Sequence, residues 1–217
     1  MKTDLQLQSD VMDELLFEPS VDAADIGVAV TDGVVTLSGF TKSYAEKMAA
    51  EKAARRVAGV KAIAEEIKVR FPSDPKTADP EIAKRILDIF EWDVTVPDDR
   101  IKVKVENGWV TLTGTVDWYF QSEAARRAAA KINGVVGVND LIEIRKLPMA
   151  HDVRDRIVSA IKRSADLDAS SITVTTEGGT VRLAGRVKAW HERDVAERAA
   201  WAAAGVVRVE DNIVIAA

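Results

Sequence analysis

Few residues of this chain have the types and spacing that catalysis or metal binding requires. The 217 residues include no cysteine, which excludes disulfides and thiolate metal sites. The two histidines, His151 and His191, stand 40 residues apart and lack the short spacing of a paired metal motif. Neither a phosphate-binding loop nor a nucleophile elbow is present. We therefore expect a protein that is not an enzyme and that uses no cofactor and no metal.

Aromatic residues offer binding chemistry instead. Trp118, Tyr119 and Phe120 stand in a row, and Trp109 follows a glycine turn. Exposed Trp and Tyr suit a membrane interface or a surface that binds a protein partner. The alternative for each ring is ordinary packing inside the fold.

The stretch around Trp109 predicts a β-hairpin. Residues 101–114 read IKVKVENGWVTLTG, with apolar and polar residues alternating on both sides of Asn107-Gly108. An Asn-Gly pair supplies the two positive-φ residues of a type I′ turn. Lys102 and Lys104 lie on the outer face of this hairpin, where they would attract phosphate head groups or form an ordinary solvated strand face.

The hairpin occurs three times, also at residues 26–39 and 172–185. The copies stay in register over whole units, so internal comparison replaces an alignment. Glycines repeat at the hairpin turn and just after the second helix, where positive φ is needed. These structural glycines are Gly33, Gly108 and Gly179 at the turns and Gly59, Gly134 and Gly205 at the helix ends.

Each copy reads helix, strand, strand, helix, strand. In the first copy, Ser43 and Glu46 form a capping-box pattern before an alanine-rich helix. In the second, Ile82, Ile86, Ile89 and Phe90 are expected on the inner face of the first helix. We predict an α+β fold of three tandem αββαβ two-layer sandwiches, each with a three-stranded mixed sheet packed by two helices.

Proline-rich and short polar segments separate the copies and define three domains, residues 1–71, 78–147 and 149–217. Because a unit of this size has a marginal core when alone, we expect the domains to contact one another.

Residues that differ between the copies are the candidates for function. Trp118 replaces a serine and an alanine, Trp109 replaces a valine and a threonine, and Trp201 replaces an arginine and an alanine. The position of Tyr119 is aromatic in every copy, which favours a packing role for its ring. We place Trp109, Trp118 and Tyr119 near one end of the middle domain, and we expect Trp201 to be a partly buried filler or a docking residue.

An acid recurs in the third strand of every copy, as Glu65, Asp140 and Asp211. Strict alternation with Ile63 and Ile67 would direct Glu65 into the core, so we expect a local β-bulge that releases it. These acids are the only candidates for binding an ion.

Composition narrows the choice of partner. The net charge is −5, which argues against general nucleic-acid binding, because that binding depends on neutralising phosphates. The first residues carry acids where a signal peptide needs an apolar core, and no apolar run is long enough for a membrane span. We expect a cytoplasmic protein without a transmembrane segment.

The G-x-V-x-L-x-G hairpin, with a helix before it and an Ala-rich helix ending at Gly-Val after it, resembles the BON domain. It is seen at residues 33–39, in near form at 108–114, and at 179–185. The resemblance implies an αββαβ fold, no catalytic residues, and a mostly periplasmic or outer-membrane-associated location. It also implies binding of anionic phospholipid or hydrophobic ligands, envelope protection under osmotic stress and chaperone-like activity, with one branch binding potassium.

Two hypotheses follow for function. The first is a non-enzymatic, stress-associated binding protein that engages phospholipid head groups or the exposed hydrophobic surface of a partner or unfolded protein. The alternative is a cytoplasmic protein that responds to ions such as potassium, or a scaffold, in which Glu65, Asp140 and Asp211 matter.

Overall fold

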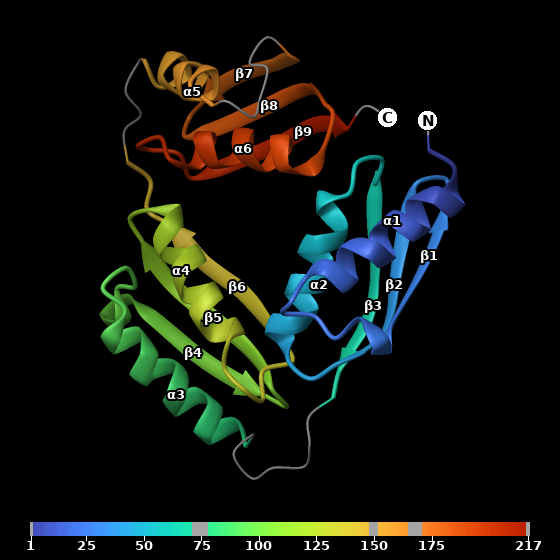
Figure 1. The fold of residues 1–217 in the computed structure, drawn as a ribbon. Coiled ribbons are helices and arrows are strands. Elements are labelled where there is room, and N and C mark those ends of the chain that lie inside the picture. The colour runs from blue at the N-terminus through green and yellow to red at the C-terminus, as the bar shows by residue number, and fades with distance from the viewer. Residues whose placement is uncertain (1, 71–77, 148–151, 165–170, 216–217) are drawn as a thin grey trace. The chain divides into compact units, whose positions relative to one another are not determined.

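The structure, a computed structural model, describes residues 2–70, 78–147, 152–164 and 171–215 (Figure 1). The chain forms three domains with the same order of elements, and each is described by itself. The first contains α1 (Asp4–Phe17), β1 (Ile26–Thr31), β2 (Val34–Thr41), α2 (Tyr44–Arg56) and β3 (Ala62–Val69), with a short 3₁₀ turn, η1 (Ala23–Asp25), before β1.

The other two domains repeat this order. The middle domain contains α3 (Asp79–Trp92), η3 (Asp98–Arg100), β4 (Ile101–Glu106), β5 (Trp109–Val116), α4 (Tyr119–Ala130) and β6 (Gly137–Ile144). The third contains α5 (Val153–Lys162), β7 (Ile172–Glu177), β8 (Thr180–Val187), α6 (Trp190–Trp201) and β9 (Arg208–Ile215).

Each sheet has its second strand in the centre. In the first domain, β1 pairs with β2 antiparallel, and β3 pairs with the other edge of β2 in parallel. Alternation along β2 buries Val35 and Leu37 completely against the helices, while the residues between them face away. The three mixed sheets and six helices confirm the predicted fold of three tandem αββαβ sandwiches.

The first helix of each domain supplies the largest core side chains. In α3, Ile82, Ile86 and Phe90 are buried at a spacing of four residues, which places them on one helix face. Ile89 was expected on this face, but it is 38% exposed. Its position, one residue before Phe90, turns it about 100° from the buried stripe.

The second helix lies close to the sheet because its inner face is made of alanines. Ala50, Ala53 and Ala54 of α2 are fully buried. Ser43 caps this helix, since its hydroxyl accepts the N–H of Glu46 at 3.1 Å. The Glu46 side chain does not complete the predicted capping box, because it accepts instead the N–H groups of Lys42 at 2.8 Å and Asp22 at 2.9 Å.

A carboxylate from the first helix holds each of the first two hairpin turns. Asp79 accepts the N–H groups of Asn107 at 2.7 Å and Gly108 at 2.9 Å. In the first domain, Asp4 does the same for Asp32 and Gly33. The six repeated turn and helix-end glycines all have positive φ, as do Asp32 and Asn107: Gly33, Gly59, Gly108, Gly134, Gly179 and Gly205.

Candidate binding site in the middle domain

Two segments of the middle domain leave the sheet at the same end. Ile101, the first residue of β4, pairs with Gly114 near the end of β5. The chain before β4 and the chain after β5 therefore lie side by side. A 2.8 Å ion pair between Arg100 and Asp117 joins them. The end of α3 and the start of α4 thus flank one end of the domain.

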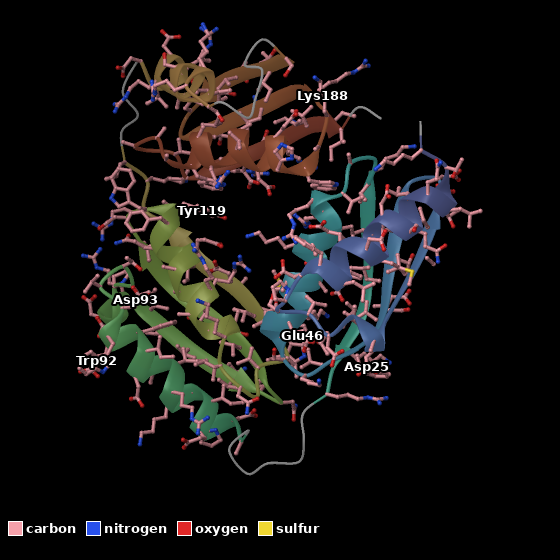
Figure 2. All side chains as sticks on the ribbon, viewed as in Figure 1. Asp25, Glu46, Trp92, Asp93, Tyr119 and Lys188 are labelled. Carbon is pink, nitrogen blue, oxygen red and sulfur yellow. The ribbon has the colours of Figure 1, made fainter. Side chains whose placement is uncertain are left out.

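Four apolar side chains are exposed at this end, and we call them the middle-domain aromatic patch: Trp92, Val94, Trp118 and Phe120. Trp92 is 86% exposed and Val94 is 99% exposed. Phe120 is 54% exposed and Trp118 is 37% exposed. Figure 2 shows Trp92 and Asp93 at the end of α3 and Tyr119 at the start of α4. Exposed apolar side chains that gather at one end of a domain can serve as an interaction surface.

The backbone that carries these side chains is held by hydrogen bonds. The Asp93 carboxylate accepts the Thr95 N–H at 2.9 Å and the Thr95 hydroxyl at 2.6 Å, which fixes the turn containing Val94. The Gln121 side chain accepts the N–H groups of Asp117 and Trp118, each at 3.0 Å, which fixes the start of α4. The patch therefore sits on ordered turns, which lowers the entropy cost of binding a partner.

Acidic side chains are in excess around the patch, although the basic Arg127 and Lys131 also act on Asp93. The two hydrogen bonds from Thr95 lower the pKa of Asp93, so that group remains ionised at neutral pH. Glu91, Asp98 and Asp99 are also exposed near this end. This charge is unfavourable for contact with an anionic surface and favourable for a neutral or basic one.

The first domain has a pocket at the equivalent place. It has a volume of about 550 Å³ and lies between residues 19–22 and the start of α2, including Ser43 and Ala45. The equivalent residues of the middle domain include Val94, Trp118 and Phe120. In the middle domain, Trp118 and Phe120 thus stand where the smaller Ser43 and Ala45 line the pocket of the first domain.

Trp109 does not belong to this patch, so the predicted grouping of Trp109 with Trp118 and Tyr119 is wrong. Trp109 begins β5, whereas Trp118 follows its last residue, Val116. A strand of eight residues is about 26 Å long, which puts these tryptophans at opposite ends of the sheet. The Trp109 ring, 50% exposed, covers Gly137 on β6, where an added Cβ would lie 2.3 Å from a ring carbon.

Tyr119 and Trp201 are both partly buried. Trp201 packs against the core of the third domain, and its indole N–H donates to Glu197 Oε1 at 3.3 Å. Tyr119 occupies the first position of α4, as Tyr44 does in α2 and Trp190 in α6. Its side chain therefore has the same structural place in all three domains.

Lys102 and Lys104 are exposed on the outer face of β4, away from the helices. Lys104 forms an ion pair with Glu106 at 2.9 Å, and both side chains are largely in solvent, where such a pair contributes little. The structure therefore places the lysines and the aromatic patch on different parts of the domain.

The acids of the third strands do face the helices, and the predicted bulge at Glu65 is wrong. The pairing of β2 with β3 runs without interruption from Val34↔Ala62 to Thr41↔Val69. Glu65 forms a 2.8 Å ion pair with Lys47 of α2, which satisfies it beside the core. Its second oxygen accepts the N–H of Ile67 at 2.9 Å.

The same arrangement recurs at Asp140 and Asp211, one acid in each domain. Asp211 pairs with Arg193 at 2.6 Å, and Asp140 accepts the hydroxyl of Ser122. Each also accepts the N–H two residues further on. The structure thus separates the three ion candidates, and within the described residues no three acids or histidines gather as a metal site.

Trp92 and Val94 belong to the patch but are not among the residues predicted from the sequence. Trp92 lies at the end of α3 outside its buried face, and the first domain also has an exposed aromatic residue, Phe17, at this position. The four-residue spacing of Ile82, Ile86 and Phe90 was a usable signal, because it excludes Trp92 from the inner face. Val94 lies between the helix and the hairpin, where periodicity carries no information.

Three tandem two-layer αββαβ domains define a class of proteins built from small repeated α+β units. Residues 3–70, 78–146 and 150–217 each match the BON domain. The chain belongs to the BON-domain family, which confirms the predicted resemblance.

A curated relative is the osmotically-inducible protein Y of Escherichia coli (strain K12). It is 34% identical over 148 residues, which cover 64% of this chain and 71% of the relative. Among solved structures, CdsD, a structural protein of the type III secretion system of Chlamydia trachomatis, matches over 96% of this chain and 91% of its own. The identity is 13% and the TM-score 0.27, so this match supports no inference. In the part of the chain that is described, no helix has the length and apolar character to cross a membrane.

Proposed function

We propose that this chain is a non-enzymatic, stress-associated binding protein whose middle domain binds the exposed apolar surface of other polypeptides. The observation that carries this proposal is the middle-domain aromatic patch. Fully burying one large apolar side chain is worth about 1.5–3 kcal/mol. A partner that covers Trp92, Trp118 and Phe120 would therefore gain substantial affinity.

The relative supports the stress association, because that protein is osmotically inducible by name. The charge around the patch supports a polypeptide partner at this site, since the carboxylates of Glu91, Asp93 and Asp98 oppose an anionic membrane surface. We predict a cytoplasmic location, and the family resemblance favours the periplasm instead. Cell fractionation distinguishes the two.

The test is suppression of the heat-induced aggregation of a client protein. The double variant Trp118→Ser, Phe120→Ala gives the middle domain the residues that the first domain has at these positions, so the fold is expected to tolerate it. We expect the concentration needed for half suppression to rise roughly tenfold.

Trp109→Val is the matched control, because it also installs a first-domain residue but lies at the other end of the sheet. It should suppress aggregation as well as the unchanged protein. Equal suppression by the double variant and the unchanged protein would refute the proposal.

A second candidate function is binding of anionic phospholipid through the outer face of β4. Lys102 and Lys104 favour it, since both side chains are exposed on one face. Co-sedimentation with anionic vesicles at low salt tests it, with Lys102→Gln, Lys104→Gln as the variant.

The ion-responsive alternative is less favoured, because Lys47 and Arg193 already bind Glu65 and Asp211. A change of tryptophan fluorescence on titration with potassium would support it.

A further inference from the structure

In two of the three domains, the acid of the third strand binds a cation from the second helix. Lys47 Nζ lies 2.8 Å from a Glu65 carboxylate oxygen and 2.8 Å from the carbonyl oxygen of Ile67. Arg193 Nε lies 2.6 Å from an Asp211 oxygen, and its guanidinium lies 5.1 Å from the centre of the Trp190 ring. The cation is thus held by a carboxylate and a backbone carbonyl in both domains, and in the third domain also by the aromatic residue at the start of the helix; we call this place the slot.

The middle domain has the acid of this slot but not the cation. Ser122 stands where the other domains have Lys47 and Arg193. Its buried hydroxyl donates to one oxygen of Asp140, and the other oxygen accepts the N–H of Ile142 at 3.0 Å. Across the described ranges, no lysine, arginine or histidine pairs with Asp140 within 4.0 Å.

The nearest basic residue along the helix is already engaged. Arg126 lies one turn after Ser122, on the same side of α4. Its Nε and Nη2 lie 3.0 Å and 2.8 Å from the two carboxylate oxygens of Glu123. This bidentate pair raises the pKa of Arg126 and holds its guanidinium on Glu123.

Serine is also much shorter than lysine or arginine. In the middle domain, residue 122 therefore brings only a hydroxyl to the acid, where the sister domains bring a cationic group. Tyr119 holds the position of Trp190, and it stands between Trp118 and Phe120 of the aromatic patch. The slot is thus adjacent to the proposed polypeptide-binding surface.

We propose that Asp140, Ser122 and Tyr119 form a receptor for a lysine or arginine side chain of the bound polypeptide. The sister domains show which chemistry this slot accepts, because their own lysine and arginine occupy it. This inference rests on the proposed function, because the basic side chain comes from the bound polypeptide. The partner is therefore an apolar segment that carries a lysine or an arginine.

The test uses two labelled peptides with the same apolar sequence, one with lysine and one with the uncharged norleucine at its centre. Their affinities for the full chain are measured by fluorescence anisotropy. A partly exposed ion pair is worth up to about 1 kcal/mol, so the unchanged protein should bind the lysine peptide about two- to fivefold more tightly.

Two variants close the slot in different ways. Asp140→Asn removes the charge but keeps oxygen and nitrogen atoms for hydrogen bonds, and Ser122→Lys supplies the cation that the first domain has. Both should bind the two peptides equally while still binding the norleucine peptide like the unchanged protein. Glu143→Gln, on the outer face of the same strand, is the control and should keep the lysine preference.

A lysine preference that persists in Ser122→Lys would overturn the inference and leave the proposed function intact. Binding of neither peptide would refute the proposed function instead. In that case, butylammonium is titrated into the protein as the probe, and its binding to the slot is measured from the backbone amide signals of Ser122 and Ile142 in NMR spectra. Shifts seen in the unchanged protein but not in Ser122→Lys support the receptor, and their absence in both overturns it.

Discussion

The indole ring of Trp109 covers the backbone of Gly137 on the neighbouring strand. A Cβ atom at Gly137 would lie 2.3 Å from one ring carbon and 2.6 Å from another. The equivalent pairs are Val34 with Ala62 and Thr180 with Arg208, which face each other across the same two strands. The only domain with a tryptophan here is the one with a glycine opposite, so packing explains Trp109.

This relationship predicts a coupling between the two positions. Gly137→Ala should destabilise the middle domain by about 1–3 kcal/mol, because the added methyl group overlaps the ring. Adding Trp109→Val installs the valine–alanine pair of the first domain and should recover most of that loss. Hydrogen exchange of β5 and β6 amides in the full chain measures it. Additive effects of the two substitutions would contradict the coupling.

The carboxylate of Asp79 should stabilise the hairpin turn of the middle domain. It accepts two backbone N–H groups, and a hydrogen bond to a charged group is worth about 1.5–3 kcal/mol. We expect Asp79→Ala to cost about 2–3 kcal/mol locally and to speed amide exchange at Asn107 and Gly108. Asp98→Ala, which removes an exposed acid of the same domain, serves as the control and should leave these amides unchanged.

The first domain should lose stability in acid partly through Glu18. Hydrogen bonds from Ser20 and then from Arg56 lower the pKa of Glu18 below its ordinary value of 4.5. Because the folded-state pKa is depressed, the stabilisation is present above pH 4.5 and is lost as the pH falls through the folded value.

Glu18→Gln should therefore be less stable than the unchanged protein at pH 7 and closer to it at pH 3. Thermal unfolding of both proteins at a series of pH values measures this difference. A gap that stays constant with pH would show that Glu18 contributes no proton linkage. Asp13→Asn, on α1 shortly before Glu18, is the comparison for a simple change of net charge.

Two glycines of the third domain should respond very differently to alanine. Gly185 has a φ of +141°, and a Cβ there would lie 2.0 Å from the carbonyl oxygen of Ser171. Gly178 has a φ of +55° and open space around a Cβ. Gly178→Ala should cost about 1 kcal/mol, whereas Gly185→Ala should unfold or displace β7. Urea unfolding monitored at β7 and β8 amides compares them, and similar costs would contradict the steric reason.

Local patterns in the sequence predicted the fold because each unit satisfies them independently. Alternation in residues 101–114 and the Asn107-Gly108 turn predicted the hairpin, and its pairing runs from Ile101↔Gly114 to Glu106↔Trp109. Agreement among three copies then separated the residues that the fold needs from those that differ.

Contacts between distant elements were not predictable in this way. The partner of Glu65 is Lys47, on a helix whose orientation is set by packing, so alternation alone suggested a bulge that does not form. The mistaken placement of Trp109 beside Trp118 came from sequence proximity, although the length of β5 already separates them. Val94 was missed because exposure in a turn depends on the local hydrogen bonds of Asp93 and Thr95.

The repetition of one small unit also determines how far the effect of a destabilising substitution extends along this chain. In the described parts of the chain, every strand of a sheet comes from its own domain, and no domain shares a ladder with another. A substitution that opens one sheet leaves the other two with all their backbone hydrogen bonds. Lys47 and Arg193 form ion pairs with the acids of the first and third domains, whereas Asp140 of the middle domain has a serine in place of a cation. Any loss of stability at Asp140 therefore affects the middle domain alone.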